Sequence, residues 1–343
     1  MRLISPLLKH AVYPTLQRAG WLGRMTPPDG YAVVNYHGVL PSDYQSEESF
    51  LDGNLVSAAA LRAQLRFLKS HYRVIAPEEF RSCIELGRPI PRSVLVTCDD
   101  GLLNTLSEML PVLQEEGVAC LFFVTSASCR EDVAMLWYEE LYRLMRKKAL
   151  SANLTELLPR DEGPHAVETF QAKWWNIVRR ASRLDADSRA RWMDRVRNEC
   201  GPPTLRNEQR WRLLNAGELR ELADAGMSIG AHTRTHPVLS LAAEEESQRE
   251  IQNCKLEIEW VLGKPVWAFA YPFGNPGTMG DREFHFAREA GYTCAFLNVE
   301  HWPGQGSNPL ALSRTHVTAD MSLAEFAAHL SGVHARLRRA VGA

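Results

Sequence analysis

The chain has 343 residues, of which 45% are hydrophobic and 23% are charged, a balance that is typical of globular proteins. Its formal net charge is −2, so no overall positive field is present to attract DNA or RNA. These values exclude long disordered spans and leave room for one large α/β domain or two modest ones.

The cysteine pattern and the N-terminal segment bear on localisation. Seven cysteines stand at scattered positions without a CxxC pair, which argues against a zinc ribbon or a redox pair and favours a reducing compartment. No apolar run approaches the about 18 residues that a bilayer-spanning helix needs, and residues 1–30 lack the continuous apolar core of a secretory signal. We therefore predict a cytoplasmic protein, in which the basic segment at residues 1–30 is a candidate for peripheral contact with a membrane.

Strand and helix patterns alternate along the first third of the chain. The wholly apolar run Val118–Val124 is typical of a strand that is buried on both faces of a parallel sheet. Leucines at helical spacing, followed by Gly117, predict a helix that ends just before it. By such criteria, strands are predicted at 31–37, 72–75, 94–98 and 118–124, and helices at 57–71, 77–85 and 102–117. This order indicates βαβ units.

The segment from about Ser126 to Arg210 breaks this alternation. It is rich in Arg, Glu, Leu and Trp, and it shows helical periodicity without strand patterns. We interpret residues 126–210 as a helical insertion, and as a candidate cap or wall of a substrate cleft.

Alternation resumes at Asn215, which forms a capping-box pattern with Glu218 at the start of a helix. Further strands are predicted at 227–231, 266–270, 292–297 and 310–317, with helices at 215–226, 242–262, 281–290 and 322–339. About seven strand–helix units predict an α/β fold, a parallel (β/α) barrel. The barrel is expected to cover residues 31–320, interrupted by the insertion, and residues 321–343 to form a C-terminal helix.

Polar side chains follow several of the predicted strands. His37, the pair Asp99 and Asp100, His232 and Tyr271 each stand where a strand is predicted to end. Barrel enzymes assemble their active sites at the carboxyl ends of the strands. We therefore expect these side chains to meet at one face of the barrel.

The sequence His232-Thr-Arg-Thr-His236 has the spacing of two metal ligands. Residues at i and i+4 lie on one face of a helix or tight turn, and neutral imidazole is the commonest metal ligand. A carboxylate from Asp99 or Asp100 would complete a set of two histidines and one carboxylate, with open positions for water and substrate. Taken alone, the HxxxH pattern also fits a polar turn, and the aspartate pair also fits a helix N-cap.

Adjacent aspartates suit metal-assisted hydrolysis. One carboxylate can bind the metal while its neighbour remains free to accept a proton. A metal lowers the pKa of its bound water, and a nearby carboxylate then completes the nucleophile as general base.

Four stretches of the chain carry a family resemblance. TCDDG, HTRTHP and FAYPFG, together with the upstream YHGV, resemble the motifs of the NodB-like polysaccharide deacetylases, carbohydrate esterase family 4. The similarity covers roughly Tyr31 to Asp132 and Leu214 to Val317. It implies a distorted (β/α) barrel of about seven strands, the NodB-homology fold, and an enzyme that removes acetyl groups from N-acetylated sugars.

The resemblance also implies roles for individual residues. Asp99 falls on the family's catalytic base and Asp100 on its metal-binding aspartate. The histidines of HTRTHP, His232 and His236, fall on the other two ligands of a divalent cation, which we expect to be zinc, although such sites accept several divalent ions. Cys98 replaces the usual Phe of the first motif.

The third motif departs from the family pattern. The family's tyrosine falls on Phe273, whose backbone N–H can still join the metal in stabilising the oxyanion. The arginine that steadies the base is missing, because its place falls on Ala270. Arg314, on the last predicted strand, is a candidate substitute, and a surface arginine is the alternative interpretation. Tyr271, just before the proline, is expected to form a cleft wall.

The proton donor for the leaving amine has two candidates. His37 in YHGV resembles the upstream histidine of a subgroup, the biofilm-polysaccharide deacetylases, and is preferred. His316 is the second candidate, although it is out of step with the family's late LxH motif, and a core histidine bonded to backbone is the alternative interpretation of His37. The other histidines, including His329 and His334, are expected to be structural or solvated and to have no partners.

The leading hypothesis is a metal-dependent hydrolase that removes N-acetyl groups from amino sugars of a polysaccharide or a lipid-linked sugar, in exopolysaccharide or cell-envelope biosynthesis. One rival is an amidase or deformylase acting on a small non-sugar amide, because the same site would serve it. Another rival is a non-catalytic carbohydrate-binding member of an exopolysaccharide assembly, which predicts loss of the metal ligands. The expected partner is an N-acetylated polysaccharide or oligosaccharide, and not a nucleic acid.

Overall fold

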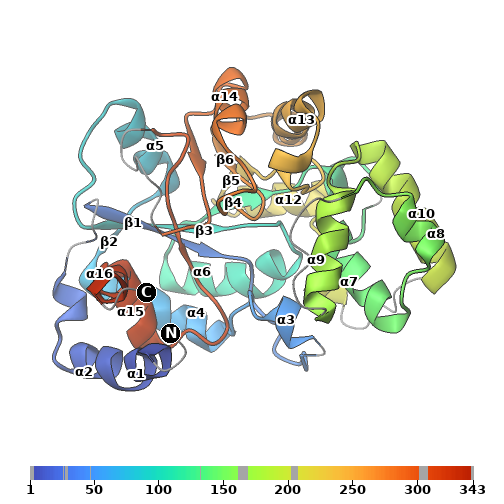
Figure 1. Cartoon of the computed structure of the whole chain (residues 1–343). Coiled ribbons are helices and arrows are strands. Elements are labelled where there is room, and N and C mark those ends of the chain that lie inside the picture. Colours follow the sequence, from blue (N-terminus) through green and yellow to red (C-terminus); the bar gives the residue numbers. More distant parts are fainter. Residues whose placement is uncertain are drawn as a thin grey trace.

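In the computed structural model, a curved sheet of parallel strands forms the centre of the molecule (Figure 1). The structure describes residues 4–340 except 26, 28, 29, 47, 132, 161–168, 202–207 and 301–307. Seven strands follow one another in the order β7-β6-β5-β4-β3-β1-β8, and the short β2 (Arg73–Val74) pairs with the start of β3. Their bounds are β1 (Tyr31–Tyr36), β3 (Ser93–Cys98), β4 (Leu121–Val124), β5 (Ser228–Ala231), β6 (Ala268–Ala270), β7 (Cys294–Phe296) and β8 (Thr315–His316).

The segment Leu310–Val317 joins the two edges of this sheet. On one side Leu297 N donates to Leu312 O at 2.8 Å, next to the parallel bridge between Phe296 and Leu312. On the other side β8 pairs with β1, and Val317 N donates to Asn35 O at 2.9 Å. The sheet therefore curves into a distorted barrel, and only a few hydrogen bonds close it.

Every strand pairing is parallel, so the carboxyl ends of the strands lie at one rim of the barrel. All residues of β3 are buried, as the apolar run that ends in two aspartates requires. The strand ends that carry Asp99, Asp100 and His232 are thus brought to the same face.

Helices cover the outside of the barrel. They are α4 (Ala58–His71), α5 (Pro77–Glu85), α6 (Leu110–Glu116), α12 (Ala216–Asp224), α13 (Glu244–Leu262) and α14 (Asp281–Glu289). The short α3 (Ser49–Asp52) instead lies at the cavity, where Leu51 joins the hydrophobic cluster of the insertion. Local sequence accounts for several of their ends. Asn215 and Glu218 form the predicted capping box at the start of α12. Gly117 and Gly263 end α6 and α13 in the left-handed conformation, with φ of 64° and 63°.

Between β4 and α12, the described residues form helices and no strand. These are α7 (Trp137–Lys147), α8 (Ala152–Glu156), α9 (Phe170–Ala181), α10 (Ala186–Cys200) and α11 (Glu208–Trp211). They share a hydrophobic cluster of their own, which includes Leu141, Trp174, Val178, Trp192 and Val196. Figure 1 shows them standing to one side of the barrel, in green.

The two ends of the chain pack together (Figure 1). The N-terminal helices α1 (Ile4–Leu7) and α2 (Tyr13–Arg18) lie beside α15 (Leu323–Leu330) and α16 (Val333–Ala340). Tyr13 is buried in the main core, and its hydroxyl lies 2.8 Å from His334 Nδ1. Lys9 Nζ lies 3.1 Å from Glu325 Oε1. The basic segment therefore contributes to the core of the domain.

The predicted fold class is confirmed: the chain is an α/β protein with a distorted barrel of parallel strands and a helical insertion. Two details differ from expectation. The single helix expected at the C-terminus is two helices, α15 and α16, because Gly332 adopts a left-handed φ of 70° between them. The strand expected at 310–317 is reduced to Thr315–His316, since the residues before it bond only to the β7 side. No helix in the described part of the chain combines the length and apolarity that a membrane span requires.

Candidate metal centre

Three buried side chains converge at the carboxyl rim of the barrel. Asp100 follows β3, His232 follows β5, and His236 stands in the loop after His232. Asp100 Oδ1 lies 3.5 Å from His232 Nε2 and 3.4 Å from His236 Nε2. One ligand atom from each residue lies within 4.8 Å of the other two. The sequence predicted that these three residues lie close together, and the structure confirms this.

Hydrogen bonding leaves one nitrogen of His232 available as a ligand. His232 Nδ1 donates to the carbonyl oxygen of Ala270 at 2.7 Å, which fixes the ring and directs the Nε2 lone pair towards Asp100. Burial opposes the ionisation of Asp100, but hydrogen bonds from His232 and His236 hold the pKa of its carboxyl well below the usual value. A charged carboxylate facing two imidazole nitrogens fits a divalent cation.

The backbone around this site is strained. Asp100, Thr233, His236 and Phe273 have positive φ values of 77°, 62°, 59° and 60°. Such conformations are costly for residues other than glycine, and they cluster at functional sites when the surrounding structure enforces them. Gly101 also has a positive φ of 75°, and a Cβ there would meet the Val124 side chain at 3.0 Å.

Asp99 occupies a separate environment beside the metal ligands. Arg314 donates to both of its carboxylate oxygens, NH1 to Oδ1 at 2.7 Å and NH2 to Oδ2 at 2.6 Å. Asn35 Nδ2 donates to Oδ2 at 2.9 Å. Burial favours the neutral acid, but the charge and hydrogen bonds of Arg314, together with the nearby His232 and His37, outweigh it and lower the pKa of Asp99. The structure therefore keeps Asp99 ionised, as a general base must be before it acts.

The motif FAYPFG forms a loop next to the two histidines. The ring of Phe273 lies 4.8 Å from that of His236, measured between centroids. The backbone N–H of Phe273 donates to no backbone carbonyl or side chain in the described part of the chain. The prediction that Tyr271 forms a cleft wall is wrong. The side chain of Tyr271, just after β6, points into the core. It is fully buried there, and its hydroxyl donates to Leu310 O at 3.1 Å.

A cavity of about 550 Å³ opens over these residues. Its floor holds both aspartates and both histidines. Its walls come from the barrel rim and from the insertion, and they include the aromatic side chains Phe50, Tyr138, Trp174, Trp175 and Phe273. Arg210 and Glu139 from the insertion also line it, and Arg210 Nε donates to Asp52 Oδ1 at 2.7 Å. A volume of this size suits a small ligand or a short part of a polymer.

Both candidates for the proton donor, His37 and His316, line the cavity. Their ring centroids are 4.8 Å apart. Burial lowers the pKa of His37, although the charges of Asp100 and Asp99 oppose this effect. Burial and the neighbouring His37 lower the pKa of His316 to about 3. Burial therefore opposes protonation of both rings.

Sequence reasoning missed several residues of the site. Asn35 bonds both Asp99 and Arg314, and its only signal was one amide in an otherwise apolar strand. Tyr138, Trp174 and Trp175 lie in the insertion, whose helical pattern carries no information about which side faces the barrel.

The comparison with family profiles identifies residues 196–295 as Polysaccharide deacetylase. This range contains His232, His236 and Phe273, while Asp99 and Arg314 lie outside it. Over these residues the chain is similar to the polysaccharide deacetylases, a family of hydrolases. No curated protein matches the sequence.

Several solved structures share the fold. IcaB from Ammonifex degensii is 19% identical with a TM-score of 0.57, over 90% of this chain and 99% of that one. The Streptococcus pyogenes deacetylase PplD, in complex with acetate, is 17% identical with a TM-score of 0.55, over 89% and 99% of the two chains. A de-N-acetylase from Aggregatibacter actinomycetemcomitans is 15% identical with a TM-score of 0.54, over 88% and 99%. This chain therefore has the fold of these proteins along almost all of their length.

Proposed function

We propose that this chain is a metal-dependent de-N-acetylase of amino sugars in a polysaccharide or a lipid-linked sugar. The observation that carries the proposal is the buried set of Asp100, His232 and His236, which lies at the floor of a cavity with an ionised aspartate beside it. Zinc is the expected ion. When bound, such an ion lowers the pKa of water and polarises a carbonyl group.

Asp99 is proposed as the general base. Its carboxylate lies next in sequence to the metal ligand Asp100, so base and ligand face the same small volume. Arg314 and Asn35 occupy its outer side and hold it in one orientation. A fixed carboxylate can then accept a proton from the water that attacks the acetyl carbonyl carbon.

Phe273 is proposed to stabilise the oxyanion of the tetrahedral intermediate through its backbone N–H. This donor is unused in the described part of the chain, and the left-handed backbone of the residue fixes its direction. A donor that is oriented before the reaction stabilises developing charge without reorganisation. His37 is proposed to protonate the departing amine, with His316 as the alternative. The charges of Asp99 and Asp100 favour protonation of both histidines, and His37 is preferred for its place in the YHGV stretch.

The cavity walls support a sugar as the substrate. Aromatic rings from Tyr138, Trp174 and Trp175 offer flat apolar surfaces, while Arg210 and Glu139 offer hydrogen-bond partners for hydroxyl groups. A small non-sugar amide would leave most of this surface unused. The intact set of three ligands and a base disfavours a non-catalytic carbohydrate-binding role.

Product analysis tests the proposal. The purified protein, loaded with Zn²⁺, is incubated with N-acetylhexosamine oligomers, lipid-linked N-acetyl sugars, and small N-acetyl and N-formyl amides. We expect acetate and a free amine from the sugar substrates. Release of formate or acetate only from the small amides would favour the amidase reading, and no turnover of any substrate by a metal-loaded chain would exclude the proposed activity.

A further inference from the structure

The two histidines of the metal centre are held in different ways. His232 stands at the end of β5, and its own ring is fixed by the bond to Ala270. His236 stands in a loop with a left-handed φ of 59°. Its Nδ1 is buried and has no hydrogen-bond partner among the described residues. The orientation of His236 must therefore come from its main chain and from the side chains packed around it.

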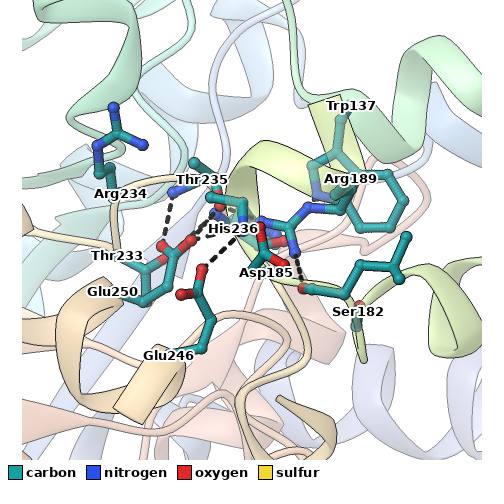
Figure 2. A network of polar contacts seen from close by, with 12 residues as sticks. Trp137, Ser182, Asp185, Arg189, Thr233, Arg234, Thr235, His236, Glu246 and Glu250 are labelled. Carbon is teal, nitrogen blue, oxygen red and sulfur yellow. Dashed lines mark hydrogen bonds and ion pairs between the residues drawn. The ribbon is translucent and has the colours of Figure 1, made fainter. Parts of the chain in front are cut away.

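The insertion holds the main chain of His236 directly. Trp137, at the start of α7, donates its indole N–H to the carbonyl oxygen of His236 at 3.1 Å. Both side chains are buried, so this bond is shielded from water. The next residue, Tyr138, places its ring 4.9 Å from the imidazole, measured between centroids. Figure 2 shows Trp137 beside His236.

A buried ion pair holds the residue before His236 (Figure 2). The backbone N of Thr235 donates to Glu250 Oε2 at 2.8 Å, and its hydroxyl contacts both Glu250 and Arg189. Arg189 Nη2 lies 3.4 Å from Glu250 Oε1, and each residue is 2% exposed. The guanidinium carbon of Arg189 also lies 5.3 Å from the centre of the Trp137 ring. Arg189 belongs to α10 of the insertion and Glu250 to α13 of the barrel.

We propose that Trp137 and Arg189 are positioning residues for the metal, and that the insertion completes the metal centre through them. They act through the main chain at Thr235 and His236 and hold the second histidine in the geometry of a ligand. A buried ion pair is a poor device for stability alone, because desolvation offsets its attraction. Groups that hold a metal ligand in place without touching the metal affect the affinity of the site. The inference rests on the proposed metal site and gives the insertion a role in it besides lining the cavity.

The substitution Trp137→Phe tests the inference, because it removes the donor to His236 and keeps an aromatic ring. Trp192→Phe is the matched control. Trp192 is also buried in the insertion. Its indole N–H donates to Leu154 O at 3.0 Å and not to the loop that carries His236. The affinity for Zn²⁺ alone is measured by competition with a chromogenic chelator, and thermal unfolding is recorded for each variant. We expect Trp137→Phe to weaken Zn²⁺ binding about 10- to 100-fold and Trp192→Phe to leave it unchanged.

Two further variants sharpen the result. Arg189→Lys keeps the charge but cannot contact both Thr235 and Leu184 as the guanidinium does, so we expect a smaller loss of Zn²⁺ affinity. In a His236→Ala background, Trp137→Phe should no longer change the residual Zn²⁺ affinity. If Trp137→Phe lowers the melting temperature as Trp192→Phe does while Zn²⁺ affinity stays at the wild-type value, the positioning role is wrong. If the wild-type chain binds no Zn²⁺, the proposed function fails together with this inference.

Discussion

Two clusters among the residues that the structure describes combine histidines with carboxylates, and a comparison shows why composition alone does not make a metal site. The rim cluster is Asp100, His232 and His236, and the terminal cluster is Glu300, His329 and His334. In each cluster one ligand atom per residue lies within 4.8 Å of the others. The rim cluster is buried at the floor of a cavity, whereas the terminal cluster is half-buried where the N- and C-terminal helices pack.

The terminal cluster has the features of an ion-pair network. His329 Nδ1 contacts Glu300, and its ring stacks on His334 with centroids 3.8 Å apart. Burial opposes protonation of His329, but Glu300 and Glu325 outweigh it and raise the pKa of the imidazole to about 9. A protonated imidazole has no lone pair to offer a metal. The prediction that His329 and His334 have no partners is therefore wrong, although both are structural.

In the rim cluster, by contrast, hydrogen bonding leaves a ring nitrogen available to a metal. His232 Nδ1 donates to a carbonyl oxygen, and His232 Nε2 faces the carboxylate of Asp100. Strained backbone at Asp100 and His236 holds this arrangement, which would not persist without support from the surrounding structure. Geometry around each nitrogen, rather than the number of histidines, separates the two clusters.

Removing a ligand from each cluster should give the largest contrast. We expect His232→Ala to lose its bound metal and to lower deacetylase activity by about 10³-fold or more, since a bound metal supplies several kcal/mol of transition-state stabilisation. His329→Ala should keep its metal content. Metal analysis of both purified variants and acetate release measure the contrast. Unchanged metal content in His232→Ala would overturn the assignment of the rim cluster.

Asp99→Asn separates catalysis from metal binding within the rim. The amide cannot accept the proton of the attacking water, so kcat should fall by about 10²- to 10⁴-fold. Zn²⁺ affinity should change little, because Asp100 and the histidines remain. Steady-state kinetics and chelator competition check the two expectations. Full activity in this variant would show that another group is the base.

Arg314→Gln alters the charge beside the base. Arg314 lowers the pKa of Asp99, so its loss should raise that pKa and shift the acid limb of the kcat/KM profile to higher pH. It should also destabilise the fold by about 3–5 kcal/mol, because it leaves Asp99 buried without its partner. Urea unfolding and a pH–rate profile measure these effects. An acid limb at the wild-type position would mean that Arg314 does not tune the base.

The sequence predicted those site residues whose position follows from the strand next to them in the chain. Asp99, Asp100 and His232 follow strands directly, and His236 is four residues after His232. Parallel strands bring their carboxyl ends to one rim, so the prediction needed no knowledge of distant packing. Arg314 was a candidate from its place on the last strand, and the structure places it against Asp99. Its role in tuning the base stays a prediction, as do those of His37 and Phe273.

The contributions of the insertion could not be predicted in the same way. Tyr138, Trp174 and the positioning residue Trp137 lie on helices whose periodicity shows an apolar face but not what that face meets. Tyr271 shows the opposite error, since a polar residue at a strand end was expected in the cleft and instead points into the core. These contacts depend on how the insertion and barrel dock, which no local pattern encodes.

The smallest effect concerns the stability of the terminal cluster. Because the pKa of His329 in the folded protein, about 9, exceeds the usual value, its stabilising contribution is complete below about pH 6.5 and is lost as pH rises through about 9. The loss should reach up to about 3 kcal/mol. Urea unfolding from pH 6 to 10 should show this slope in the wild type and not in His329→Asn.

His285→Asn serves as the control for that slope, because His285 also lies near a glutamate, with Nε2 3.2 Å from Glu289 Oε1, but its side chain is 59% exposed. Exposed pairs contribute about 0–1 kcal/mol, so this variant should retain the wild-type slope. Adding saturating Zn²⁺ should leave the slope unchanged, since the metal binds only at the rim. If Zn²⁺ abolished it, the metal would be replacing the proton on His329, and the terminal cluster would be a second metal site.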